Sequence, residues 1–176
     1  MPTRKADVEA ERALRESGHI GEVPIDIEAV AGHLGAQVIR ERLDRGVSGL
    51  LFRDGDSIII GVNDLHASRR QRFTVAHEVG HLVLHKGRPL VLDHVRVNFR
   101  DSMSSAATNA EEIEANQFAA EILMPRDLVI REAKRLLEDD PAATDASIVP
   151  LLAQGFDVSD QAMEYRLINL GFRRQA

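Results

Sequence analysis

The chain contains no cysteine among its 176 residues. Disulfide bonds, thiol catalysis and cysteine-ligated zinc are therefore excluded, and any metal ion must be bound by His, Asp or Glu. The sequence also lacks an apolar run that approaches the length of a membrane span. Its first 17 residues are rich in charged side chains and have no apolar core of signal-peptide length. We therefore expect a cytoplasmic protein.

The chain has no excess of positive charge. Its formal net charge of -6 gives no general attraction for nucleic acid or for an anionic membrane, although a local basic patch remains compatible with it. Apolar residues make up 44% and charged residues 28% of the sequence, which is an ordinary balance for a globular protein. A chain of this length supports one domain with a substantial core, and we expect that domain to span residues 1–176.

Local sequence signals predict a mainly helical α+β fold. A hairpin is expected around Asp54-Gly55, a dipeptide that favours a tight turn. The hairpin and one preceding strand would form a small antiparallel sheet of about three strands, with residues 91–99 as a further strand or an extended loop. Strands are expected at residues 37–43, 47–52 and 57–62, and helices at 4–17, 27–34, 68–85, 110–123, 125–137, 144–154 and 159–170.

The helix at residues 68–85 carries the motif H-E-x-x-H, formed by His77, Glu78 and His81. Residues four apart lie on the same face of a helix, so the two imidazoles can reach one metal ion. Glu78 lies about 100° further round the axis, where a general base beside the metal would stand. The flanking residues are apolar nearly all round, which favours a buried helix over a pair of surface histidines. A metal ion would give these buried polar groups a partner.

A catalytic zinc ion needs three protein ligands and one open position. His85 is eight residues beyond His77, about 12 Å along a helix, so it cannot join the same ion and is expected to cap the last turn of its helix. Helical geometry leaves Glu111 and Glu112 as near-equal candidates for the third ligand. The alternative explanation for this acidic cluster, stabilisation of a helix N-terminus, fits Glu111 and Glu114 well.

Two sequence blocks resemble the ImmA/IrrE family of metallopeptidases, zincin-type enzymes similar in plan to the gluzincins. These are R-F-T-V-A-H-E-V-G-H-L at residues 72–82 and E-I-E-A-N-Q-F-A-A-E-I-L-M-P at residues 112–125. The resemblance implies that the small sheet packs on the motif helix and that Glu112 is the third zinc ligand. It also implies that Asn116 hydrogen-bonds a ligating histidine, although a polar residue at the edge of the core is an equally good explanation for Asn116.

The resemblance implies a zinc-dependent metallopeptidase in which Glu78 takes a proton from a zinc-bound water and delivers it to the leaving amine. The expected substrate is a protein cleaved at one site, a helix-turn-helix repressor or an antitoxin. Mn²⁺ or Fe²⁺ could replace zinc in such a site. The donor for the oxyanion is not identified by the sequence, and Tyr165, His94 and Arg69 are candidates. The alternative function is a non-proteolytic, metal-containing regulator that binds a repressor or DNA.

Residues 151–167 have the outline of a helix-turn-helix. The exposed positions of the second helix include Asp160 and Glu164, which do not suit a DNA backbone. We therefore expect the helical pair within residues 141–176 to pack on the peptidase core, and we expect neither direct DNA binding nor membrane binding. An extended peptide substrate would lie along an edge strand, for which residues 58–62 and 95–99 are the candidates.

Overall fold

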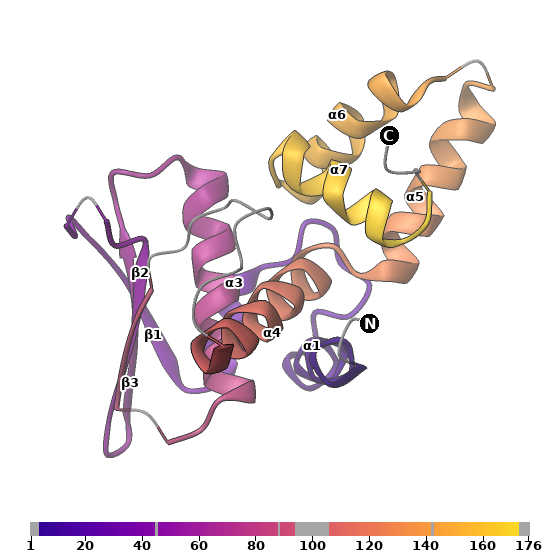
Figure 1. Cartoon of the computed structure of the whole chain (residues 1–176). Helices are drawn as coiled ribbons and strands as arrows, with labels where there is room; N and C mark the ends of the chain where they lie inside the picture. The colour runs from indigo at the N-terminus through magenta and orange to yellow at the C-terminus, as the bar shows by residue number, and fades with distance from the viewer. Residues whose placement is uncertain (1–3, 45, 88, 94–105, 142, 173–176) are drawn as a thin grey trace.

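The computed structural model describes residues 4–44, 46–87, 89–93, 106–141 and 143–172 (Figure 1). In these parts of the chain, seven helices surround or extend a four-stranded sheet. In chain order the elements are α1 (Arg4–Ser17), α2 (Ile27–His33), β1 (Ala36–Glu41), β2 (Gly49–Asp54), β3 (Ser57–Asn63), α3 (Ser68–Leu84), β4 (Leu90–Asp93), α4 (Ala106–Leu123), α5 (Arg126–Asp139), α6 (Asp145–Phe156) and α7 (Asp160–Asn169).

The sheet has the strand order β1-β3-β2-β4. The expected α+β class with a small sheet is confirmed, but the sheet is mixed and has one more strand than expected. The hairpin of β2 and β3 is antiparallel, β4 adds to β2 in the antiparallel sense, and β1 runs parallel to β3. Only the hairpin is a local pairing. The other two pairings join segments distant in sequence, which is why local signals did not specify them.

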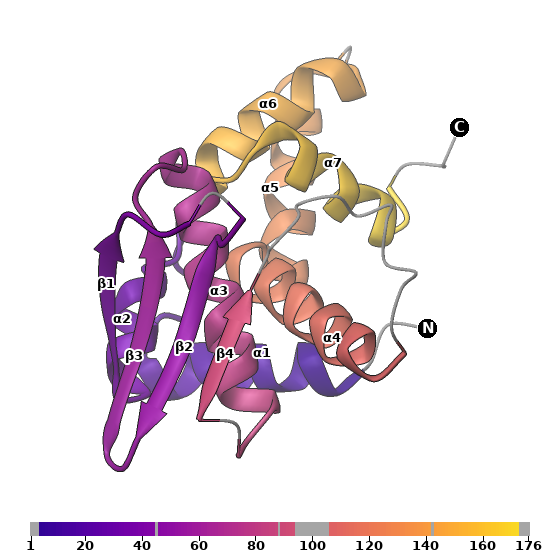
Figure 2. The same ribbon diagram turned by 60° about the vertical axis from the view of Figure 1, so that its left-hand side comes forward.

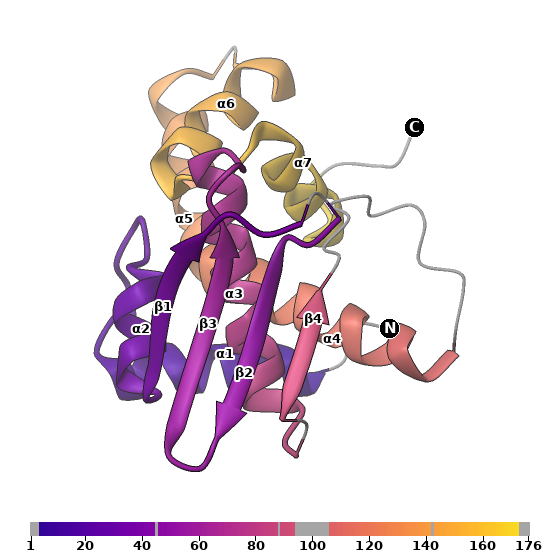
Figure 3. The ribbon, with the colours of Figure 1, turned by 90° about the vertical axis from the view of Figure 1, so that its left-hand side faces the viewer.

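The helices cover one face of the sheet. Figures 1 and 2 show α3 lying directly against this face, with α4 and α1 beyond it. Figure 3 looks onto the opposite face, which none of the helices in the described part of the chain covers. Side chains alternate accordingly, because successive residues of a strand point to opposite faces. Leu51 and Ile60 on the covered face are fully buried, whereas Phe52 and Leu90 are exposed.

The strand order corrects one expectation. Residues 58–62, a candidate edge for a peptide substrate, belong to β3, which has β1 on one side and β2 on the other. Its backbone groups are used within the sheet, so the prediction was wrong. The second candidate, residues 95–99, lies outside the described residues. Within the described part of the chain, β4 is the last strand on that side of the sheet.

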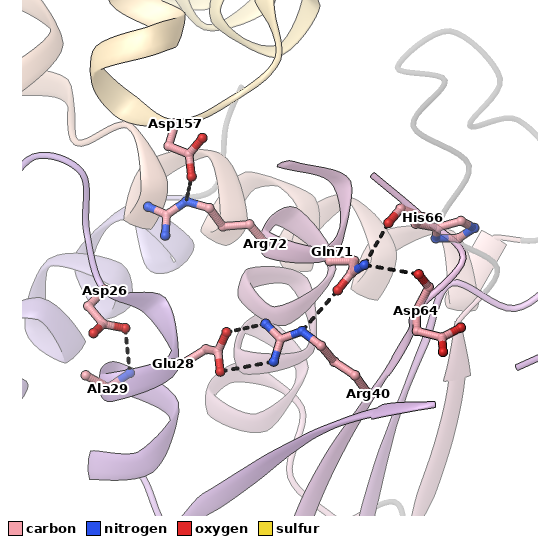
Figure 4. Close-up of polar contacts among 9 residues, drawn as sticks. All are labelled: Asp26, Glu28, Ala29, Arg40, Asp64, His66, Gln71, Arg72 and Asp157. Carbon is pink, nitrogen blue, oxygen red and sulfur yellow. Dashed lines mark hydrogen bonds and ion pairs between the residues drawn. The ribbon is translucent and has the colours of Figure 1, made fainter. Parts of the chain in front are cut away.

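A network of polar contacts positions the N-terminal half of α3 (Figure 4). Arg40 on β1 donates to the carboxylate of Glu28 on α2, and its Nε donates to Oε1 of Gln71 on α3 at 3.0 Å. The next residue of α3, Arg72, has its Nε 3.7 Å from Oδ2 of Asp157, in the turn after α6. Helix α3 is thus tied to the sheet, to α2 and to the C-terminal helices.

The C-terminal helix α7 is attached to the end of α4 through Arg166. This side chain is only 7% exposed, donates from Nε to the carbonyl of Met124 at 2.9 Å, and pairs with the carboxylate of Glu121. Apolar residues of α7, among them Met163 and Leu167, are buried as well. Arg166 is therefore enclosed by protein and is not available to a DNA backbone.

Two further observations concern the helices. Helix α4 begins at Ala106, earlier than the expected residue 110, so part of the small polar stretch before the acidic cluster is helical. Among the described residues, none of the helices combines the length and apolar character that a bilayer crossing demands.

The Arg166–Glu121 pair yields a stability prediction. Arg166→Ala leaves the carboxylate of Glu121 buried without its cation, so the free energy of unfolding measured by urea titration should fall by about 3 kcal/mol. Replacing both partners by apolar residues, Arg166→Met with Glu121→Leu, should restore most of the loss. The matched control is Arg135→Ala, because Arg135 is an exposed helix-surface partner of Glu132 and Asp139. A single Arg166→Ala variant as stable as wild type would contradict the assignment.

Candidate metal centre

The motif residues lie in the interior of the protein. Helix α3 is enclosed by the sheet on one side and by α4 on the other, and every residue from Phe73 to His81 is buried. Side chains of His77 and Glu78 have no exposed surface, and His81 is 1% exposed. Polar side chains in such a position require partners, because their transfer from water is otherwise unfavourable by several kcal/mol.

The structure brings His77, His81 and Glu112 together as a group that could hold a metal ion. The two Nε2 atoms are 3.0 Å apart, Nε2 of His77 is 3.3 Å from Oε2 of Glu112, and Nε2 of His81 is 3.3 Å from Oε1 of Glu112. Ligands about 2.0–2.1 Å from a tetrahedral ion are separated by roughly 3.3–3.4 Å. The two Nε2 atoms and the two carboxylate oxygens of Glu112 are therefore separated by distances close to those between ligands of one tetrahedral zinc ion.

The protonation state of Glu112 also suits a ligand. Burial opposes ionisation of this carboxyl, but hydrogen bonds and charge interactions with His77 and His81 outweigh burial and lower its pKa well below the ordinary value. Glu112 is consequently a carboxylate at neutral pH. Its side chain is 37% exposed while the two histidines are enclosed, so the ligand group is accessible from the side of Glu112.

The approach of α4 to α3 depends on Gly80, inside the motif. A Cβ atom built on Gly80 would lie 3.1 Å from both Cα and the carbonyl oxygen of Ala115 on α4. These are backbone atoms within a helix, so they cannot move aside independently. The absence of a side chain at Gly80 lets the two helices cross closely, and this crossing carries Glu112 to the histidines.

The ring of each of the two histidines has a hydrogen-bond partner on its Nδ1 nitrogen. Nδ1 of His77 is 3.0 Å from Oδ1 of Asn116, one turn after Glu112 on α4. Nδ1 of His81 is 3.0 Å from Nδ1 of His85, whose Nε2 is 3.1 Å from the carboxylate of Glu114. If both Nε2 atoms are kept for a metal ion, each ligating ring carries its proton on Nδ1. His81 then donates to His85, and His85 donates to Glu114.

The expectation that His85 caps the last turn of α3 is confirmed for its backbone, whose N–H donates to the carbonyl of His81 at 3.1 Å, but its side chain has another role. Its ring instead joins His81 to Glu114, as described above. Burial lowers the pKa of His85, and the hydrogen bond to Glu114 only partly opposes this effect, so the ring is neutral at neutral pH as the donor chain requires. Arg53 on β2 also binds carbonyls at the end of α3. Its guanidinium donates to the carbonyl of His81 at 3.0 Å and to that of His85 at 3.2 Å.

Glu78 follows His77 on α3, and its carboxylate lies against the first residue of β2. Both of its carboxylate oxygens are buried. Burial lowers the pKa of the nearby Arg53, and the negative charge of Glu78 raises it in part, so the two side chains interact electrostatically. A buried carboxylate next to a metal-ligand group has the chemical character of a general base.

The three candidates for an oxyanion donor fall in different places. Arg69 is two turns before His77 on α3, about 12 Å along the axis, and its Nε lies 3.4 Å from Oδ1 of Asp157. Tyr165 is half-buried on α7. His94 lies outside the described residues. Arg69 therefore contacts the C-terminal helices, and neither Arg69 nor Tyr165 is identified as the oxyanion donor by the described residues.

Sequence reasoning missed four contributors to the centre. Arg53 and Glu114 each act on α3 from another element, so no local pattern revealed them. His85 showed a usable signal, its spacing of four residues from His81, but that spacing alone did not distinguish a ring partner from a helix cap. Gly80 belongs to the block at residues 72–82, but the sequence alone gives no structural reason for a glycine there.

Comparison with known proteins agrees with this geometry. The family described as the IrrE N-terminal-like domain matches residues 31–168, which include α3 and α4 with all three candidate ligands. Among curated proteins, a ureidoglycolate hydrolase from Oryza sativa subsp. japonica is 26% identical over 149 residues, covering 83% of this chain and 29% of the rice protein.

Among solved structures, a Mycobacterium tuberculosis transcriptional regulator has the same fold, with a TM-score of 0.59 and 20% identity. The match covers 93% of this chain and 46% of that chain. The chain thus spans less than half the length of both relatives. Because the family match extends over most of the sequence, the chain belongs to the Peptidase_M78 family of IrrE N-terminal-like domains.

Proposed function

We propose that this protein is a zinc-dependent metallopeptidase that hydrolyses a peptide bond in a protein substrate. The observation that carries the proposal is the triangle of donor atoms from His77, His81 and Glu112 with the buried carboxylate of Glu78 beside it. We assign residues 1–176 to one metallopeptidase domain, which the continuous hydrophobic cluster from α1 to α7 supports.

In this proposal His77, His81 and Glu112 are the metal ligands. A bound zinc ion would polarise the substrate carbonyl and lower the pKa of a coordinated water. Glu78 accepts a proton from the attacking water as the water oxygen bonds to the substrate carbonyl carbon. It then delivers this proton to the amide nitrogen, so that the C–N bond breaks and the amine leaves as a neutral group. Two histidines and one carboxylate suit zinc best, although Mn²⁺ and Fe²⁺ accept the same donor types.

We further propose that the substrate segment binds in an extended conformation along β4. This strand pairs with β2 on one side, and its residue Asp93 is opposite Gly49, the point at which β2 passes Glu78. A peptide added to the other side of β4 would be held by backbone hydrogen bonds and directed toward the ligand group. This proposal replaces the earlier candidate at residues 58–62.

The biological substrate that we favour is a helix-turn-helix repressor or an antitoxin. Two observations support a regulatory target: the family to which the chain belongs, and the fold shared with a protein named as a transcriptional regulator. The second candidate function is a metal-containing regulator that holds such a partner without cutting it. A binding protein has no need of a buried base, so Glu78 favours the peptidase.

The first experiment tests the catalytic role of Glu78. Each candidate helix-turn-helix repressor or antitoxin is co-expressed with the chain, as wild type and as Glu78→Gln. We expect cleavage by the wild type only, with zinc retained in both, because the amide cannot accept the proton. Equal cleavage by both would refute the base assignment, and co-purification of an uncut complex from both would support the binding function.

The second experiment tests the ligand set. Glu112→Ala should lose zinc on dialysis, because two histidines alone leave the ion without its third protein donor. Glu111→Ala, one residue earlier on the same helix, should keep it. Metal content is measured by atomic emission after dialysis. Loss of zinc from the Glu111 variant instead would transfer the ligand role to the neighbouring residue.

The third experiment tests the hydrogen-bond chain behind His81. His85→Ala removes the acceptor for Nδ1 of His81 and should weaken zinc binding by roughly 10–100-fold in a chelator competition. His85→Asn places an amide oxygen near the former Nδ1 position and should recover part of the affinity. An unchanged affinity in the alanine variant would show that the chain to Glu114 does not orient the ligand.

A further inference from the structure

We propose that Gly49 is a positioning residue for Glu78, and that the lack of a side chain at this point of β2 sets where the carboxylate lies. The inference rests on the proposed peptidase function, in which Glu78 is the base. Gly49 is the first residue of β2 and pairs with Val62 of β3 and Asp93 of β4. It does not adopt a positive φ angle, so its backbone conformation is open to any residue.

The requirement for glycine is therefore one of space. A Cβ atom built on Gly49 would lie 2.7 Å from Oε1 of Glu78 and 2.4 Å from Cγ2 of Thr74, with the carbonyl oxygen of Gly61 at 3.2 Å. Thr74 and Glu78 are one turn apart on α3, so this face of the helix lies directly on the backbone of β2. The carboxylate of Glu78 occupies space that any larger residue would take.

Of the three neighbours, the side chains of Thr74 and Glu78 must both move, because the added Cβ would lie closer than 3.0 Å to each of them. Thr74 is fully buried, and its hydroxyl donates to the carbonyl of Arg70 at 3.1 Å, which holds its methyl group toward Gly49. The carbonyl of Gly61 belongs to a central strand paired on both sides. An added methyl group must therefore displace the methyl group of Thr74 and also the carboxylate of Glu78. The carboxylate moves by about half an ångström or more, since C···O contacts are ordinarily about 3.3 Å or longer.

Such a displacement affects the base without removing the ligands. The three atoms nearest to the added Cβ belong to Thr74, Glu78 and Gly61, and none belongs to His77, His81 or Glu112. Catalytic groups must be held within about 0.5 Å of their productive positions, and a misplacement of about 1 Å can reduce the rate on the order of 100-fold. Gly49→Ala should thus lower kcat while KM and zinc affinity stay near wild type.

The test uses the zinc-loaded full chain and a peptide spanning the cleavage site found by co-expression. Gly49→Ala is expected to reduce kcat by roughly 10–100-fold. Gly61→Ala is the matched control, because the three atoms nearest to its added Cβ all belong to the side chain of Leu50 and none belongs to α3. This control should keep wild-type kcat. Wild-type kcat in the Gly49→Ala variant would overturn the proposal.

A double variant separates positioning from packing. Thr74→Ser removes the methyl group that an alanine at position 49 would strike and leaves the hydroxyl in place. Gly49→Ala with Thr74→Ser should regain the wild-type melting temperature, while kcat remains low because the contact with Glu78 persists. Recovery of kcat together with the melting temperature would mean that Gly49 serves only packing, and the proposal would fail.

A spectroscopic measurement keeps this test independent of peptidase activity. The carboxyl carbon of Glu78 is observed by NMR in protein carrying ¹³C-labelled glutamate and is assigned by its absence from Glu78→Gln. Its chemical shift should change in Gly49→Ala with Thr74→Ser and not in Gly61→Ala. An unchanged shift in the double variant refutes the positioning role. Absence of cleavage by the wild type refutes the proposed function instead, while the shift still tests the placement of Glu78.

Discussion

The burial of three ionisable side chains in the middle of one helix is the constraint that the rest of the structure satisfies. His77, Glu78 and His81 lie where a soluble protein ordinarily places aliphatic residues. Each neighbouring element supplies some of the polar or charged partners of these three side chains. Helix α4 supplies a carboxylate and an amide to the rings, and β2 supplies a cation near Glu78. The sheet and α4 are therefore positioned by polar contacts as well as by the apolar core.

Close packing makes these polar contacts possible. Gly80 admits α4 on one side of α3, and Gly49 admits Glu78 against the sheet on the other. Neither glycine has the positive φ angle for which the residue is usually selected. Both instead shorten the distance between layers, so that side chains of ordinary length meet across the interface. Gly80 and Gly49 thus affect both the distances from α3 to α4 and to the sheet and the placement of the polar side chains of the centre.

Much of the centre could be predicted because its strongest signals are local. The spacing of His77 and His81 identified a shared face, and the apolar flanks predicted burial of α3. Glu112 was harder: helical geometry left Glu111 equally possible, and only a family resemblance favoured one of them. The parallel pairing of β1 with β3, and the chain from His81 to Glu114, depend on how distant segments cross. Such crossings are tertiary outcomes that no local periodicity encodes.

The packing of α1 on α4 has a consequence for how the chain is made. Asp7 on α1 accepts a hydrogen bond from Gln117 on α4, across a separation of 110 residues. A ribosome adds about 5–20 residues per second, so the first helix waits several seconds for its partner. During that interval its small apolar face, which includes Ala10 and Leu14, has no α4 to cover it. The contact between α1 and α4 thus forms only after α4 has emerged, and Glu112 joins His77 and His81 only then as well.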